Sequence, residues 1–181
     1  MTFKFHTQES APVESKAQLD ASLKAFGMIP NLHAVMAEAP NVLQAYKMLH
    51  DLFQDTSFNN EELTVIWQTI NVENECLYCV PAHTGIAKMM GIDDAIIDAL
   101  RSRTKLPTKK LQVLHETTLA LVRDRGRPEQ SIISAFYQVG YENRQLLEIV
   151  LGISQKVMSN YINHLAATPV DEAFEQFIWS K

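Results

Sequence analysis

Signals for helix starts and ends recur along the whole chain, and no convincing run of alternating apolar and polar residues is present. Asn59 and Glu62 have the spacing of a capping box, and apolar residues follow them at helical spacing from Leu63 to Ile70. Helix starts elsewhere carry proline near the first helical position, and helix ends carry glycine at Gly27, Gly91 and Gly140. These signals predict an all-α fold.

The same signals bracket the candidate helices. They fall near residues 15–26, 30–38, 41–55, 60–73, 76–90, 94–102, 108–124, 128–139, 143–166 and 170–178. Thr168 and Asp171 repeat the capping-box spacing before the last of them. Gly85 and Gly152 lie inside predicted helices, where each costs about 1 kcal/mol of helix propensity. Each glycine indicates that another segment packs closely against its helix at that point, although neutral drift explains Gly152 equally well.

The length and charge of the chain limit its organisation and partners. A chain of 181 residues without a linker or low-complexity tract is expected to form one domain, 1–181. The net charge is −5 and the longest basic run is Lys109-Lys110, so no stripe is available for nucleic-acid phosphates. The N-terminus lacks a signal-peptide core, and no run of about 18 apolar residues could span a membrane. We therefore expect a cytoplasmic protein that binds neither nucleic acid nor membrane.

The pattern C-x-x-C-x-x-x-H, formed by Cys76, Cys79 and His83, contains both cysteines of the chain. Cytoplasmic thiols are kept reduced, so a close pair there is more often catalytic, redox-sensing or metal-binding than structural. On a helix, residues three apart are neighbours, and His83 lies one turn beyond Cys79. The spacing predicts a redox-active disulfide between the cysteines and a histidine that carries protons.

Other interpretations of the motif are weaker. Two buried cysteines can act as small apolar residues beside a core histidine, which composition alone would favour. Zinc would need a fourth ligand, such as His115 or His164. Haem attachment needs a histidine where Val80 stands. We expect no metal and no cofactor.

The segment from Asn74 to Gly85, with the apolar helix before it, resembles the core of the alkylhydroperoxidase D / carboxymuconolactone decarboxylase family. The motif core covers about residues 60–102. The stretches 26–31 and 155–161 resemble the peroxidase-related branch of the family and extend the similarity over most of the chain.

This resemblance implies an all-α, AhpD-like multi-helix bundle that forms a homo-oligomer. It also implies a peroxidase site in which Cys79 attacks, Cys76 resolves and His83 relays the proton. The family's relay glutamate falls at Thr64, which cannot act as a carboxylate base, and Tyr78 replaces a histidine of the mycobacterial type. Glu62 and His164 are further candidates for the relay or the pocket.

The favoured function is a thiol-dependent peroxidase that reduces a small hydroperoxide and is recycled by an external thiol or disulfide reductant. One alternative is a decarboxylase-like lyase in which His83 is the acid/base on a small carboxylated lactone. Another is a non-catalytic oligomeric family member. The dithiol favours the redox enzyme, because proton transfer on a lactone needs no sulfur pair.

Overall fold

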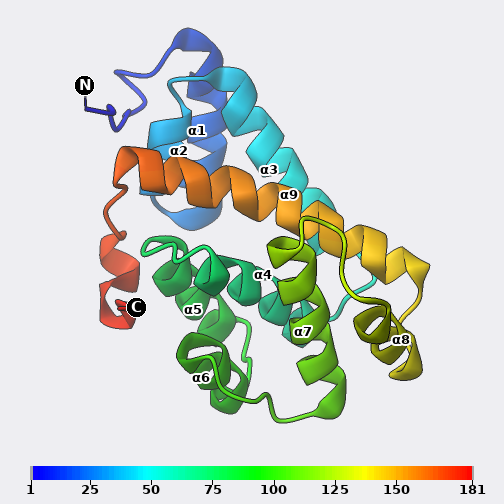
Figure 1. The fold of residues 1–181 in the computed structure, drawn as a ribbon. Helices are drawn as coiled ribbons and strands as arrows, with labels where there is room; N and C mark the ends of the chain where they lie inside the picture. The colour runs from blue at the N-terminus through cyan, green and yellow to red at the C-terminus, as the bar shows by residue number, and fades with distance from the viewer. Residues whose placement is uncertain (1, 181) are drawn as a thin grey trace.

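The computed structural model describes residues 2–180, and within that range every regular element is helical (Figure 1). This confirms the predicted all-α fold class. The elements are α1 (Val13–Phe26), α2 (Asn31–Met36), α3 (Pro40–Gln54), α4 (Asn60–Glu73), α5 (Cys79–Met89), α6 (Asp94–Ser102), α7 (Lys109–Arg123), α8 (Gln130–Gln138), α9 (Asn143–Ala166) and the 3₁₀ helix η1 (Glu172–Phe177).

Several predicted helix boundaries are confirmed. Asn59 accepts a hydrogen bond from the Glu62 backbone N–H, and the Glu62 carboxylate accepts one from the Asn59 N–H, which completes the capping box of α4. Helix α9 has the predicted bounds. The glycines at 27, 91 and 140 all have positive φ, as expected for residues that end helices.

Two predictions about helix starts are wrong. The cysteine helix begins at Cys79 and not at residue 76, because Glu75 adopts φ 52° and turns the chain just before Cys76. Thr168 makes no capping box with Asp171, whose carboxylate instead accepts hydrogen bonds from the Asn31 N–H and the Tyr78 hydroxyl. The last helix is correspondingly a short 3₁₀ turn.

Helix α9 crosses the molecule between its two apolar cores (Figure 1). The larger core joins α4, α6, α7 and α8 and includes Trp67, Phe136 and Ile149. The smaller core joins α1, α2 and α3 to the cysteine turn, and Met158 and Ile162 of α9 pack against it. Both cysteines therefore face the middle and C-terminal half of α9.

The predicted close approach at Gly152 is confirmed. A Cβ at this position would lie 2.7 Å from the Phe53 ring of α3 and 3.2 Å from Ile66 of α4. We expect Gly152→Ala to lower the free energy of unfolding by about 1–3 kcal/mol, because the extra carbon overpacks a dense core. Chemical denaturation measures the change. Ser154→Ala, on an exposed site of α9, is the control and should stay within about 0.5 kcal/mol of wild type.

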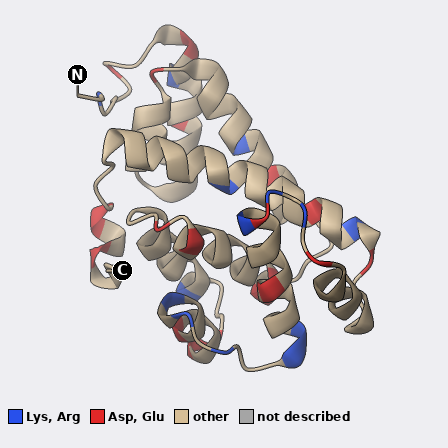
Figure 2. Cartoon of the chain, in the orientation of Figure 1, with Lys and Arg blue, Asp and Glu red and all other residues tan. Residues whose placement is uncertain are grey.

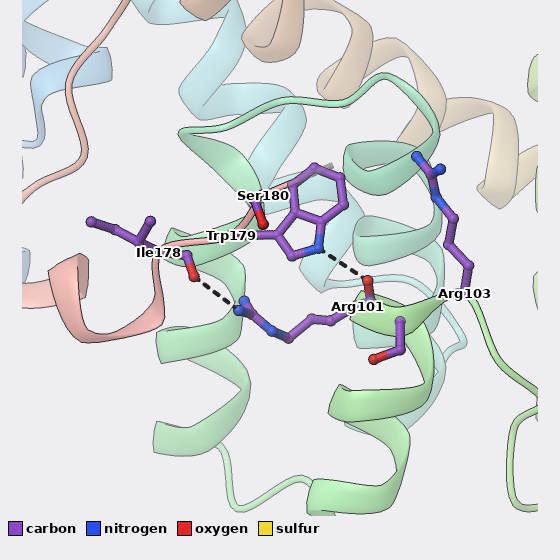
Figure 3. A pocket seen from close by; sticks show the side chains of 6 residues that line it. Arg101, Arg103, Ile178, Trp179 and Ser180 are labelled. Atoms are coloured by element: carbon purple, nitrogen blue, oxygen red, sulfur yellow. Dashed lines mark hydrogen bonds between the residues drawn. The ribbon is translucent and has the colours of Figure 1, made fainter.

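The C-terminal segment is held against α5 and α6. Gly85 makes room for the Phe174 ring, which a Cβ would overlap. Figure 3 shows the guanidinium of Arg101 donating to the carbonyl of Ile178 (3.2 Å) and the indole of Trp179 donating to the carbonyl of Arg101 (3.0 Å). These contacts hold residues 172–180 over the helix that carries Cys79 and His83.

Charged side chains are spread over many elements (Figure 2). Lysine and arginine residues occur on most of the long helices and are not gathered along one of them. Among the described helices, none is both long enough and apolar enough to cross a bilayer.

Candidate active site

The turn before α5 places the two cysteines in different local environments. The Cys76 N–H donates to the Asn71 carbonyl at 3.0 Å, which ties the turn to the end of α4. Cys76 Sγ then accepts the backbone N–H of Cys79 at 3.3 Å. Cys76 therefore precedes the helix and Cys79 opens it, and both residues are buried.

A buried polar stripe on α9 faces this turn. Its residues follow helical spacing and are at most 4% exposed. They are Lys156, Ser159, Asn160 and Asn163. Our sequence analysis missed all four as site residues. Polar residues spaced at i, i+3, i+4 and i+7 within an otherwise apolar helix were the available signal.

Asn163 joins both sulfurs. Its Nδ2 lies 3.2 Å from Cys79 Sγ and 3.9 Å from Cys76 Sγ. The hydroxyl of Ser159 lies 4.0 Å from Cys79 Sγ. One amide group therefore reaches the whole dithiol, so the two sulfurs share a single polar pocket within the smaller core.

Side-chain amides hold this arrangement between α4 and α9. Asn160 donates to Asn71 at 3.0 Å and accepts from Asn74 at 2.9 Å. Asn71 in turn donates to Gln68, which binds the carbonyl of Val80 in the first turn of α5. Because these groups are buried and paired, they fix the position of the cysteine turn.

His83 contacts a lysine. Its Nε2 lies 2.8 Å from Lys156 Nζ, and both side chains are buried. Within residues 2–180 no hydrogen bond joins His83 to either sulfur. The hydrogen-bond partner of His83 is therefore Lys156, and direct pairing of the histidine with Cys79 is not seen.

The two thiols differ in acidity. Burial by itself raises the pKa of Cys79, but a hydrogen bond from the Cys76 thiol and the charge of Lys156 bring it below the ordinary thiol value. The amides of Asn160 and Asn163 lower it further. The same hydrogen bond, made with Cys76 as donor, raises the pKa of Cys76, and burial adds to the effect. These surroundings favour ionisation of Cys79 over that of Cys76.

The cation beside Cys79 is Lys156. Burial lowers the pKa of Lys156, and the nearby cysteines raise it in part. Burial, followed by the charge of Lys156, holds the pKa of His83 well below its usual value. A neutral imidazole can accept a hydrogen bond from the ammonium group. The arrangement therefore fits a neutral His83 that accepts a hydrogen bond from Lys156.

An aromatic and amide wall closes the other side of His83. The Trp67 ring lies 5.1 Å from the His83 ring and stacks on His50 at 5.6 Å. Gln155 Oε1 accepts from the Trp67 indole at 2.8 Å, and Gln155 Nε2 lies 3.0 Å from His50 Nδ1. Burial lowers the pKa of His50 to about 4, so this wall adds no second cation near neutral pH.

A pocket of about 580 Å³ opens beside the cysteine turn. Its lining is Asn74, Glu75, Cys76, Leu77, Tyr78, Asn163, His164, Ala167 and Thr168. Cys76 lies on its wall, and Asn163 connects it to Cys79. The volume suits a small organic molecule.

Two residues proposed for the proton relay lie elsewhere. Glu62 accepts from Tyr141 at 2.8 Å and lies 3.0 Å from Lys110, in addition to capping α4. Thr64 donates to the Asn60 carbonyl at 2.8 Å within its own helix. Their hydrogen bonds do not involve the cysteines, and Lys156 occupies the place beside His83.

The other two candidates do border the pocket. Tyr78 donates to Asp171 at 2.5 Å and accepts from the Leu32 N–H at 3.4 Å, so its hydroxyl ties the cysteine turn to two other segments. His164 is exposed and lies on the rim beside Cys76. Within residues 2–180, no group of three or more His, Cys, Asp or Glu side chains is arranged to hold a metal ion.

Solved structures with this fold are related to peroxidases. An AhpD-core, peroxidase-related protein from Ralstonia eutropha JMP134 superposes with a TM-score of 0.82 at 16% identity, covering 96% of this chain and 95% of that one. A peroxidase-related protein from Silicibacter sp. TM1040 gives 0.80 at 16% identity, covering 96% and 92%. The chain therefore has the AhpD-like fold, as the sequence resemblance implied.

A third solved structure with this fold is the debrominase Bmp8. A form with one cysteine replaced by alanine, in complex with 2,3,4-tribromopyrrole, gives a TM-score of 0.80 at 13% identity, covering 97% of this chain and 95% of that one. No family model matches the sequence, and no curated protein matches it either. Solved structures with this fold thus include two peroxidase-related proteins and a debrominase.

Proposed function

We propose that the protein is a thiol-dependent peroxidase in which Cys79 is the nucleophile. The observation that carries this proposal is the buried group around Cys79 Sγ, where the Asn163 amide donates to the sulfur and Lys156 supplies a positive charge. A thiolate is the reactive form of cysteine, and this environment favours it.

In the first half-reaction the Cys79 thiolate attacks one peroxide oxygen and the O–O bond breaks. The sulfur becomes a sulfenic acid, and the alkoxide that leaves takes up the proton that the Lys156–His83 pair received from Cys79. The Cys76 thiol then attacks the sulfenic sulfur, which forms the disulfide and releases water. The net change is loss of two thiol hydrogens and reduction of ROOH to ROH and water.

An external thiol must restore the dithiol. We expect it to attack Cys76, which lies on the pocket wall, because Cys79 has the lower thiol pKa and is the better leaving group. The reductant is therefore a small dithiol or a protein segment that can insert a cysteine into the pocket.

Thiol counting tests this function. Reduced protein mixed with tert-butyl hydroperoxide should lose both thiols, and the intact mass should fall by about two mass units as the Cys76–Cys79 disulfide forms. Added dithiothreitol should restore the original mass. Unchanged thiols, or covalent dimers alone, would contradict the proposal.

Reductive debromination is the second candidate, favoured by the bromopyrrole bound in the Bmp8 structure. The same dithiol could supply two electrons, converting R–Br into R–H and bromide as the disulfide forms. Of the two thiol protons, one enters R–H and the other is released. Incubation of the reduced protein with 2,3,4-tribromopyrrole tests this, with bromide release and thiol loss as readouts. Bromide release without peroxide reactivity would replace the first proposal by the second.

We also propose a homo-oligomer that uses the exposed apolar stripe of α9, which includes Leu147 and Leu165 at 73% and 72% exposure. Sedimentation at micromolar concentration should show a dimer or larger species. Leu147→Glu should weaken the association, whereas Val13→Glu, at an equally exposed site on α1, should not. A monomeric wild type would contradict the proposal.

A further inference from the structure

Two buried side-chain oxygens beside the dithiol have no hydrogen-bond partner among the described residues. They are Asn163 Oδ1 and Thr168 Oγ1. Asn163 is 4% exposed and Thr168 is 8% exposed, and both residues line the pocket beside Cys76. Buried polar atoms are nearly always paired, so two unpaired ones at the same pocket indicate a site for a polar group from outside the chain.

The end of α9 explains why these side chains lie together. Ala167 adopts a left-handed conformation with φ 47°, and the Thr168 N–H folds back onto the Asn163 carbonyl at 3.1 Å. Thr168 does not cap the following turn, because that turn begins at Asp171 without a side-chain cap. The chain reversal therefore places Thr168 in the lining of the pocket, with its hydroxyl oxygen buried and unpaired.

The orientation of the Asn163 amide follows from its sulfur contacts. Its Nδ2 donates toward both cysteines, at 3.2 Å and 3.9 Å. The reverse orientation would place the carbonyl oxygen against the Cys79 thiolate, where two acceptors repel each other. The thiolate thus fixes the amide so that Oδ1 is left to accept a hydrogen bond from another molecule.

We propose that Asn163 Oδ1 and Thr168 Oγ1 bind the hydrogen-bond donor of the substrate and so determine its class. The substrate is a small organic molecule that carries an O–H or N–H group next to its reducible atom. One amide then does two things: its nitrogen holds the attacking sulfur, and its oxygen holds the molecule to be attacked. The identification of this ligand as the substrate rests on the proposed thiol-dependent function.

Two other residues of the pocket, Leu77 and Ala167, offer apolar surface to such a ligand. Leu77 is 52% exposed and offers an apolar surface at the rim, and Ala167 lies on the lining. A ligand with a short apolar body and one polar end therefore matches both parts of the pocket. A hydroperoxide has the O–H donor beside its O–O bond, and a bromopyrrole has the N–H donor in its ring.

Binding of an inert probe tests the proposal without relying on turnover. The probe is 2-phenyl-2-propanol, an alcohol with one O–H donor, and its methyl ether is the matched compound without a donor. Both would be titrated into reduced protein and followed by NMR chemical shifts of the residues near the pocket. We expect the alcohol to bind more tightly than the ether, by about three- to ten-fold.

The variants separate the threonine hydroxyl from general packing. Thr168→Val should weaken alcohol binding about three- to ten-fold and leave ether binding unchanged, and Thr168→Ser should restore the alcohol affinity. Thr117→Val is the control, because Thr117 Oγ1 is also buried and unpaired but lies on α7 away from the pocket. It should bind both compounds as wild type does.

Three results would each overturn the proposal. They are equal binding of alcohol and ether, no binding of the alcohol at millimolar concentration, and equal effects of the two valine variants. Donor-dependent binding in a protein whose thiols resist hydroperoxide and bromopyrrole would instead leave the binding site standing and remove the proposed function. The two ideas can therefore fail separately.

Discussion

Replacing Lys156 by Met should slow alkylation of Cys79 by iodoacetamide at pH 7 by about ten-fold or more. Lys156 is buried, and its charge is one of the groups that lower the pKa of Cys79. Without it, one of these stabilising groups is lost and the pKa of the Cys79 thiol should rise. The thiolate persists above that pKa, so the alkylation rate against pH should move to higher pH. Labelling would be performed in a Cys76→Ser background, so that only Cys79 reacts.

The stability of the lysine variant distinguishes a charge effect from unfolding. Removing a buried charge in favour of an apolar side chain of similar length is often neutral or stabilising, so the melting temperature should hold or rise. Lys47→Met is the control, because the hydrogen bonds of Lys47 go to Gln18 and Ser22 of α1. An unchanged alkylation profile in Lys156→Met would remove the lysine from the mechanism.

The helices of this fold could be predicted from the sequence because their signals are local. The capping box of Asn59 and Glu62 and the apolar spacing of residues 143–166 depend only on neighbours in sequence, and the structure confirms both helix starts. The Thr168–Asp171 pair has the same local signal but failed. There Asp171 finds partners at Asn31 and Tyr78, and these long-range contacts outweigh the cap.

The motif predicted the place of the site but not the partner of its histidine. Spacing put His83 one turn from Cys79, and on an isolated helix that would suffice for contact. In the folded chain Lys156 of α9 lies beside His83 and is its hydrogen-bond partner. No local rule connects residue 83 to residue 156, because the pairing exists only once α5 packs against α9.

Thr64 stands where the family that the sequence resembles has its relay glutamate, and Lys156 is the charged residue beside His83 instead. Thr64 cannot accept a proton from a thiol, and its hydroxyl is used within α4. A carboxylate beside Cys79 would also raise the thiol pKa, whereas an ammonium group lowers it. In the proposed mechanism Lys156 stabilises the thiolate and the neutral His83 accepts its hydrogen bond, so the relay would need no acidic residue.

The contrast between the two cysteines leads to the second large expected effect. Cys79 has the lowered pKa and the closer Asn163 amide, at 3.2 Å against 3.9 Å for Cys76. Cys76 lies outside the helix and donates to its partner, which raises its pKa. The sequence resemblance implies attack by Cys79, with His83 as the proton relay. The structure supports the same assignment through Lys156 and Asn163.

Peroxide treatment should therefore leave one sulfenic acid on Cys76→Ser and almost none on Cys79→Ser, as measured by labelling with a dimedone-type probe. Cys76→Ser keeps Lys156 and Asn163 beside Cys79 and puts a hydroxyl donor in place of the Cys76 thiol. Because no resolving thiol remains, the sulfenic acid on Cys79 should persist. Both cysteines are buried, and Cys76 is the one that lines the pocket. Labelling of Cys79→Ser alone would mean that access outweighs acidity and would transfer the nucleophile to Cys76. Equal labelling of the two variants would mean that the buried charge on α9 activates neither thiol selectively.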